Sequence, residues 1–140
     1  MPPEVSLATT SPAPVRVFLV DDSNSMIERA AAVLKPECVV VGTAHNGADA
    51  LDAVGTLRPD VVVLDISMPG MTGLEVASAL RHQGSSAAVV FLTVHDDQDF
   101  VTAAQEAGGT GYVVKRRLAS DLIVAVQEAR AGRSFVSALS

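Results

Sequence analysis

Hydrophobic residues along the chain occur in short runs that alternate with longer segments of mixed polarity. The runs are rich in valine and mostly continuous, which is typical of parallel strands that are buried on both faces. We therefore predict strands at residues 15–20, 38–41, 61–64, 88–92 and 112–114.

Each predicted strand is followed by a segment in which apolar residues recur with the period of an α-helix. Thr72 and Glu75 have the spacing of a capping box, which predicts a helix that runs to about His82. Ser120 is the predicted N-cap of the last helix. The other boundary signals are Pro36 after the first helix, Asn46 before the second, Asp96, Asp97 and Asp99 at the start of the fourth, Gly108 and Gly109 at its end, and Gly132 after the fifth.

This repeated strand–helix alternation predicts an α/β fold with a parallel sheet and helices on both of its faces. Short links favour a doubly wound, flavodoxin-like (βα)5 sheet of strand order 2-1-3-4-5 in a single domain. Residues 1–14 hold four of the seven prolines and one charged residue, Glu4, and are predicted to be a flexible leader. The predicted domain covers residues 15–137 and is followed by a short tail, 138–140.

The composition excludes several classes of protein. Acidic residues outnumber basic ones by 16 to 10, for a net charge of −6, so we expect no direct binding of nucleic acid, which usually needs a basic face. The single cysteine, Cys38, excludes an internal disulfide and a cysteine-rich zinc site. No apolar run approaches the roughly 20 residues that cross a bilayer, and no signal peptide is recognisable. We therefore expect a cytoplasmic protein with no membrane contact.

Polar residues that follow the predicted strands indicate a site, because ligands of such sheets bind beyond the carboxyl ends of the strands. Asp21 and Asp22 follow the first strand, and Asp65 follows the third. Thr93 follows the fourth strand and Lys115 the fifth. At about 4 Å and an effective dielectric of about 20, each pair of carboxylates repels by roughly 4 kcal/mol. A hard divalent cation with oxygen ligands is therefore expected there, Mg²⁺ or alternatively Mn²⁺.

The same residues suggest a reaction. A cation, the ammonium group of Lys115 and the hydroxyl group of Thr93 around a carboxylate are typical of phosphoryl transfer, here with an acyl phosphate as product. Each motif alone has a structural explanation, since Asp-Asp after a strand is often a helix cap and Pro69-Gly70 favours a plain turn. Their joint position at four strand ends favours the functional interpretation.

The sequence resembles the receiver domain of bacterial two-component response regulators, which has a CheY-like fold. The resemblance covers residues 15 to about 137. Its most specific motifs are Val-Asp-Asp at 20–22, Leu-Asp-Ile-Ser-Met-Pro-Gly-Met-Thr-Gly at 64–73, Leu-Thr at 92–93 and Gly-Tyr-Val-Val-Lys at 111–115. The resemblance implies a phosphorylatable signalling switch that a sensor histidine kinase controls, and not an enzyme that turns over a substrate.

The resemblance also implies a role for each site residue. Asp65 would be the phosphoacceptor, and Lys115 and Thr93 would contact the phosphoryl group. Tyr112 would move into the space that Thr93 vacates, and so change the surface of the fourth helix, the fifth strand and the fifth helix. The implied metal ligands are Asp22, Asp65, Asp21 (through water or a hydrogen bond) and the backbone carbonyl of Ser67.

A closer resemblance is to the NarL/FixJ, or LuxR-type, subfamily, and residues 39–47, 94–97 and 131–137 carry it. Members usually continue into a helix-turn-helix DNA-binding domain, whereas this sequence stops at Ser140. The chain is expected to be either a stand-alone receiver or a receiver cut from a longer regulator. Its output would pass through a partner, a homodimer or a DNA-binding domain that is separate or missing.

Arg116 departs from the usual receiver pattern, in which proline commonly follows the lysine, often after a cis bond. A cis bond before a residue other than proline costs about 3 kcal/mol, which argues against that geometry here. Arg116 and Arg117 also place positive charge beside the site.

Three further residues flank the expected phosphoryl group. Val94 stands where receivers often have alanine or serine, and its bulk predicts slower phosphorylation and dephosphorylation of Asp65. Ser67 and His95 occupy variable positions and are expected to tune the lifetime of the phosphoryl group.

Three alternative functions use related residues. An interaction module that no longer uses phosphate is disfavoured because all five family positions at the strand ends are present. An aspartate-dependent phosphohydrolase would need further acid–base residues and usually a cap domain. A flavin-binding flavodoxin would need a phosphate-cradling loop where Asp21 and Asp22 stand.

Overall fold

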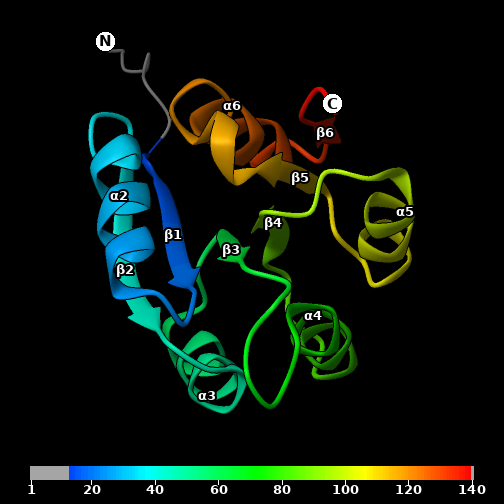
Figure 1. Cartoon of the computed structure of the whole chain (residues 1–140). Coiled ribbons are helices and arrows are strands. Elements are labelled where there is room, and N and C mark those ends of the chain that lie inside the picture. Colours follow the sequence, from blue (N-terminus) through cyan, green and yellow to red (C-terminus); the bar gives the residue numbers. More distant parts are fainter. Residues whose placement is uncertain (1–12, 140) are drawn as a thin grey trace, which may run out of the picture.

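A parallel sheet lies between two layers of helices in the computed structural model, which describes residues 13–139 (Figure 1). From one edge to the other the strands are β2 (Cys38–Ala44), β1 (Val15–Val20), β3 (Val61–Leu64), β4 (Ala88–Thr93), β5 (Gly111–Val114) and β6 (Phe135–Val136). The predicted α/β class and the order 2-1-3-4-5 are confirmed, and β6 extends the sheet beyond them. Most of the predicted leader, residues 1–12, lies outside the described residues.

Helices cover both faces of this sheet (Figure 1). They are α2 (Asn24–Leu34), α3 (Gly47–Leu57), α4 (Gly73–His82), α5 (Gln98–Glu106) and α6 (Leu118–Arg130), with a short 3-10 turn η1 (Lys115–Arg117) between β5 and α6. Helices α2 and α6 pack on one face, and α3, α4 and α5 pack on the other. All four residues of β3 are buried because apolar layers lie on both of its sides. Among the described residues, no helix has both the length and the apolar character needed to cross a membrane.

Side-chain caps fix the starts of three helices as the sequence predicts. Asn46 accepts a hydrogen bond from the Asp49 amide at 2.9 Å at the start of α3. Thr72 and Glu75 form both hydrogen bonds of a capping box at α4. Asp97 caps α5. The sequence therefore sets these boundaries locally, before any tertiary packing is considered.

The predicted cap of the last helix is wrong. Helix α6 begins at Leu118 and continues directly from η1, so Ser120 lies within its first turn. Its hydroxyl donates to the carbonyl of Arg117 at 3.3 Å and to Asp121 Oδ1 at 2.9 Å. A capping pattern in the sequence cannot reveal that the preceding turn already has helical backbone.

Two strand predictions also need correction. The second strand does not end at residue 41: β2 runs on to Ala44, because its register against β1 shifts between Val17 and Phe18 and Phe18 then pairs with Gly42. A Cβ at Gly42 would lie 2.8 Å from the Phe18 ring, so the glycine lets the ring approach the strand. Strand β6 was missed because two residues are too few to show a period. Strands β4 and β5 are each one residue longer than predicted.

The peptide bond after Lys115 is trans, because no cis peptide bond occurs within residues 13–139.

Candidate functional site

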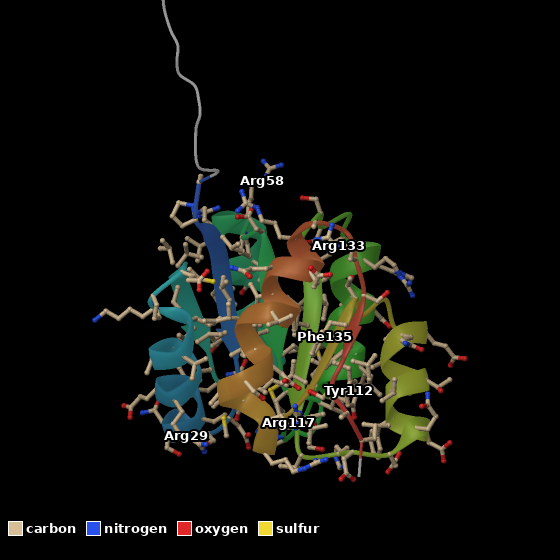
Figure 2. The ribbon with its side chains drawn as sticks, turned by 90° about the horizontal axis from the view of Figure 1, so that it is seen from above. Arg29, Arg58, Tyr112, Arg117, Arg133 and Phe135 are labelled. Carbon is tan, nitrogen blue, oxygen red and sulfur yellow. The ribbon has the colours of Figure 1, made fainter. Side chains whose placement is uncertain are left out.

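The adjacent strands β1 and β3 bring three carboxylates together at their carboxyl ends. Asp21 and Asp65 are only 4% and 5% exposed, whereas Asp22 is exposed. One oxygen atom of each residue lies within 4.8 Å of an oxygen of the others. This end of the molecule is marked by Arg117 in Figure 2, and Arg58 marks the opposite end. The acidic residues that the sequence placed at separate strand ends therefore form one cluster.

Lys115 is the counter-ion of this cluster. Its Nζ atom lies 2.9 Å from Asp21 Oδ2 and 3.2 Å from Asp65 Oδ2, and its side chain is 14% exposed. Lys115 directly follows β5, as the sequence predicts, and opens the turn η1, which directs its side chain back over the strand ends. Because two buried carboxylates share this one ammonium group, the cluster keeps a net negative charge.

Burial and nearby charges shift the pKa values of both Asp65 and Lys115. Burial raises the pKa of the Asp65 carboxyl, Lys115 lowers it and Asp21 raises it again, and the net pKa is above the usual value. Burial lowers the pKa of Lys115, but its carboxylate partners outweigh burial and the net pKa is raised. The ammonium group therefore stays charged at neutral pH, and a further cation near Asp65 would favour the ionised carboxylate.

The acidic cluster has the donor atoms for a hard metal ion. Asp21 Oδ1 accepts a hydrogen bond from the Ser23 amide at 2.8 Å, while the buried Asp21 Oδ2 makes no hydrogen bond and has only the ion pair with Lys115. The Ser67 amide donates to Asp65 Oδ1 at 3.3 Å and brings the loop after β3 against the cluster. Three carboxylates with an incompletely satisfied buried oxygen fit Mg²⁺, which takes oxygen ligands and needs few of them from protein.

Thr93 ends β4 and is fully buried beside the site. Its Oγ1 accepts a hydrogen bond from the His95 amide at 3.4 Å. Val94 between them is 64% exposed, whereas Thr93 is buried. The predicted effect of Val94 on access to Asp65 stays a prediction.

His95 connects the two loops at the mouth of the site. Its Nε2 atom lies 2.7 Å from Ser67 Oγ, and its ring stacks on Phe100 with a centroid separation of 3.9 Å and an interplanar angle of 6°. Phe100 was not among the predicted site residues, because it belongs to the next helix and its spacing from His95 carries no signal. The stacking holds the imidazole in place for its contact with Ser67.

Tyr112 is buried, at 1% exposed, and its hydroxyl donates to the His95 carbonyl at 2.7 Å. Burial raises the pKa of Tyr112 to about 12, and Asp97 and Asp96 add to the shift. The residue is therefore not a surface aromatic. His95 joins Tyr112 on its carbonyl side and Thr93 on its amide side.

Gly73 supports the site from the start of α4. Its amide donates to the Ile66 carbonyl at 2.8 Å, and a Cβ atom at this position would collide with the carbonyl of Asp65. Sequence reasoning missed this role, since Gly73 had been only the last residue of the receiver motif at 64–73. Its close approach lets the first turn of α4 lie against the backbone of Asp65.

Comparisons with known proteins agree with this geometry. The family model described as the response regulator receiver domain matches residues 17–127. The nitrate/nitrite response regulator protein NarL of Escherichia coli K12 is 32% identical over 126 residues, which are 89% of this chain and 58% of that protein. NarP of the same strain is 40% identical over 121 residues, which are 85% of this chain and 55% of that protein. The chain thus spans little more than half the length of these relatives.

Solved structures show the same relationship. The signal receiver domain of NarL from Mycobacterium tuberculosis has a TM-score of 0.82 and 34% identity, over 87% of this chain and all of that one. A two-component response regulator of the LuxR family from Aurantimonas sp. SI85-9A1 has a TM-score of 0.83 and 30% identity, over 88% and 89% of the two chains. The chain belongs to the response regulator receiver domain family of two-component signalling, in its NarL/LuxR branch.

Proposed function

We propose that Asp65 accepts a phosphoryl group from a phosphorylated histidine of a sensor kinase in a reaction that requires Mg²⁺. The observation that carries this proposal is the position of Lys115 Nζ, 3.2 Å from Asp65 Oδ2 within a cluster of three carboxylates. Receiver domains of response regulators are signalling modules and not conventional enzymes. The chain would therefore catalyse only its own phosphorylation and dephosphorylation.

The proposed step is an in-line displacement at phosphorus. A carboxylate oxygen of Asp65 forms a bond to phosphorus while the bond from phosphorus to the kinase imidazole breaks, and the electron pair passes to the ring nitrogen. Lys115 Nζ, already beside Asp65, donates to a phosphoryl oxygen, and the buried Thr93 hydroxyl lies at the neighbouring strand end as a second donor. The product is an acyl phosphate on Asp65.

The metal would be held by Asp21, Asp22, Asp65 and the backbone carbonyl of Ser67. Receiver domains bind Mg²⁺ through an acidic pocket, and the three carboxylates here supply oxygen atoms that lie within 4.8 Å of one another. When bound, the ion neutralises charge on the phosphoryl oxygens. The protein residues keep the carboxylates in position and offset their repulsion through Lys115.

The switch would begin at Thr93 and reach Tyr112 through His95. Movement of Thr93 toward a phosphoryl group pulls on the His95 amide, and the His95 carbonyl holds the Tyr112 hydroxyl. Tyr112 is already buried, so the proposed change is a joint shift of Thr93, His95 and Tyr112, and not the movement of an exposed Tyr112 ring into the protein. The affected surface is formed by α5, β5 and α6, which correspond to the fourth helix, fifth strand and fifth helix of the sequence prediction.

This surface would control a partner, self-association or a DNA-binding domain. The matched region is 58% of NarL and 55% of NarP, so any DNA binding would lie outside the domain that we propose at residues 15–137. The sensor kinase is the expected partner on the input side. In keeping with the family, we place the protein in the cytoplasm.

Phosphorylation by acetyl phosphate and Mg²⁺ tests the proposal. Intact mass should show one added phosphoryl group on the wild type and on Asp99→Asn, an exposed matched control, and none on Asp65→Asn. Chelation of Mg²⁺ should prevent the gain. No labelling of the wild type by acetyl phosphate or by candidate kinases would favour the interaction module, and turnover of added phosphate esters would favour the phosphohydrolase.

A further inference from the structure

Residues 135–139, here called the C-terminal strap, lie along the outer edge of β5 (Figure 1). The Phe135 amide donates to the Thr110 carbonyl at 3.2 Å, and the Ser137 amide donates to the Tyr112 carbonyl at 2.8 Å. Figure 2 labels Phe135 and Tyr112 on these neighbouring segments, beside α6. Leu139 packs against the apolar layer that contains Tyr112. The strap therefore covers the edge of the sheet next to the proposed switch.

The strap is anchored by a buried polar group. Ser137 is 2% exposed, and its Oγ donates to Asp121 Oδ2 at 2.7 Å and accepts from the Val114 amide at 3.2 Å. Asp121 is 6% exposed and also accepts from Arg117 Nε at 2.9 Å. Charge-assisted hydrogen bonds of this kind are about twice as strong as neutral ones. The strap is thus anchored to Val114, which precedes Lys115 in the chain, and to Asp121, which follows it.

Two paths join the strap to the acidic cluster. On the first, Lys115 contacts Asp65, and its neighbour Arg116 donates through Nη2 to the Ala138 carbonyl at 3.3 Å. On the second path, the Tyr112 hydroxyl donates to the His95 carbonyl in the loop after β4, and the Tyr112 carbonyl accepts from the Ser137 amide. The position of Lys115 and the position of that loop therefore both fix where the strap lies.

We propose that the strap is held on β5 while Asp65 is unmodified and loosens when Asp65 carries a phosphoryl group. This inference rests on the proposed function. On this proposal Lys115 Nζ, now 3.2 Å from Asp65 Oδ2, moves from the carboxylate oxygen to an oxygen of the added phosphoryl group. Val114 and Arg116 on either side of Lys115 both bond to the strap, so the shift disturbs its contacts. Phosphorylation of Asp65 thereby changes the contacts of the C-terminal end of the domain, just before Ser140.

Hydrogen exchange on the full chain tests this coupling. The protein is pulse-labelled in Mg²⁺ with and without acetyl phosphate, phosphorylation is followed by intact mass, and the peptide that contains the strap is compared with one that contains β3. Phosphorylation should speed exchange in the strap at least tenfold and leave β3 unchanged. A phosphorylated protein with unchanged strap exchange would overturn the inference and leave the proposed function standing. Failure to gain a phosphoryl group would overturn both.

A variant tests the coupling in the opposite direction. Ser137→Ala removes the anchor, and Ser134→Ala is the matched control at an exposed position. Coupling between two sites is reciprocal, so a loosened strap should shift the phosphorylation equilibrium toward the phosphorylated protein. Ser137→Ala should exchange strap amides about tenfold faster without phosphate and reach a several-fold higher equilibrium ratio of phosphorylated to unmodified protein in acetyl phosphate, with Ser134→Ala at the wild-type values. A loosened strap with a wild-type equilibrium ratio would contradict the proposal, and the wild-type exchange experiment decides the matter if Ser137→Ala does not fold.

Discussion

Ser67 Oγ lies 2.7 Å from His95 Nε2, so a side-chain hydrogen bond joins the loop after β3 to the loop after β4. Each residue stands two positions beyond a residue of the proposed site, Asp65 or Thr93. The stacking of His95 on Phe100 fixes one end of this bridge. We expect this bridge to shield one side of a phosphoryl group on Asp65 from water.

Breaking the bridge should shorten the lifetime of the acyl phosphate. We expect His95→Ala and Ser67→Ala to lose the phosphoryl group about tenfold faster, a difference of about 1.4 kcal/mol in the barrier. The measurement is the decay of the phosphorylated mass after acetyl phosphate is removed. His82→Ala, an exposed histidine at the end of α4, is the control and should decay at the wild-type rate. Wild-type lifetimes in both bridge variants would show that the bridge does not limit access.

Val94→Ala should speed both phosphorylation and dephosphorylation, by about three- to tenfold. Val94 is 64% exposed and follows the buried Thr93, so its side chain does not support the core, and we expect its bulk to hinder access to Asp65. The rates are measured by intact mass with acetyl phosphate. Val124→Ala, a 44% exposed position on α6, is the matched control, and neither variant should change the free energy of unfolding by more than about 0.5 kcal/mol. Unchanged rates in Val94→Ala would remove the steric argument.

Lys115→Met should destabilise the protein most when no metal is present. Removing one partner of a buried ion pair leaves an uncompensated charge, which costs about 3–5 kcal/mol. Urea unfolding in chelator should show this loss, and Mg²⁺ should restore more stability to the variant than to the wild type. Lys35→Met, at an exposed position, should behave as the wild type. Equal unfolding free energies of Lys115→Met and the wild type in chelator would mean that Lys115 does not offset the carboxylates.

Asp121→Asn should lose stability at neutral pH and resemble the wild type in acid. Burial raises the pKa of Asp121, but hydrogen bonds from Arg117, Ser137 and Ser120 outweigh it and the net pKa is lowered. A carboxyl whose pKa is lower in the folded state stabilises the fold above its unfolded pKa, near 3.9, and loses that contribution as the pH falls through its folded pKa. The expected difference is about 1–3 kcal/mol at pH 7, measured by urea unfolding against pH.

A matched control is available at the exposed pair of Glu128 and Arg133, where a hydrogen bond from Arg133 also lowers the pKa of Glu128. Because solvent screens this pair, Glu128→Gln should unfold close to the wild type at every pH. A pH-independent difference for Asp121→Asn would show that it reflects packing and not the charge of Asp121.

Two glycine substitutions should have opposite effects. Gly73→Ala places a methyl group against the carbonyl of Asp65, so it should lower the free energy of unfolding by about 1–3 kcal/mol and slow phosphorylation. Gly55→Ala lies within α3, where no heavy atom stands within 4 Å of the new methyl group, and should raise the free energy of unfolding by roughly 0.5–1 kcal/mol. Urea unfolding and labelling by acetyl phosphate check both. Similar effects of the two variants would mean that the contact with Asp65 is unimportant.

The sequence predicted the sheet order and the meeting of Asp21, Asp22 and Asp65, because both follow from continuous apolar runs and from the polar residues at their ends. It could not predict contacts that depend on tertiary packing. His95 stacks on Phe100, and Phe135 pairs with β5. In both contacts the spacing of the partners along the sequence follows neither a helix nor a strand period. The cap prediction at Ser120 failed because the preceding turn, η1, continues directly into α6.

Strand β1 enters the sheet at Val15, and the acidic cluster begins just after its last residue, Val20. Six residues at about 3.3 Å each separate these two ends by roughly 20 Å. A fluorophore or affinity tag joined ahead of Val15 would therefore enter the domain far from Asp65. The same tag joined after Leu139 would abut residues that pack near Tyr112. Labelled protein for signalling measurements is best tagged on the N-terminal side.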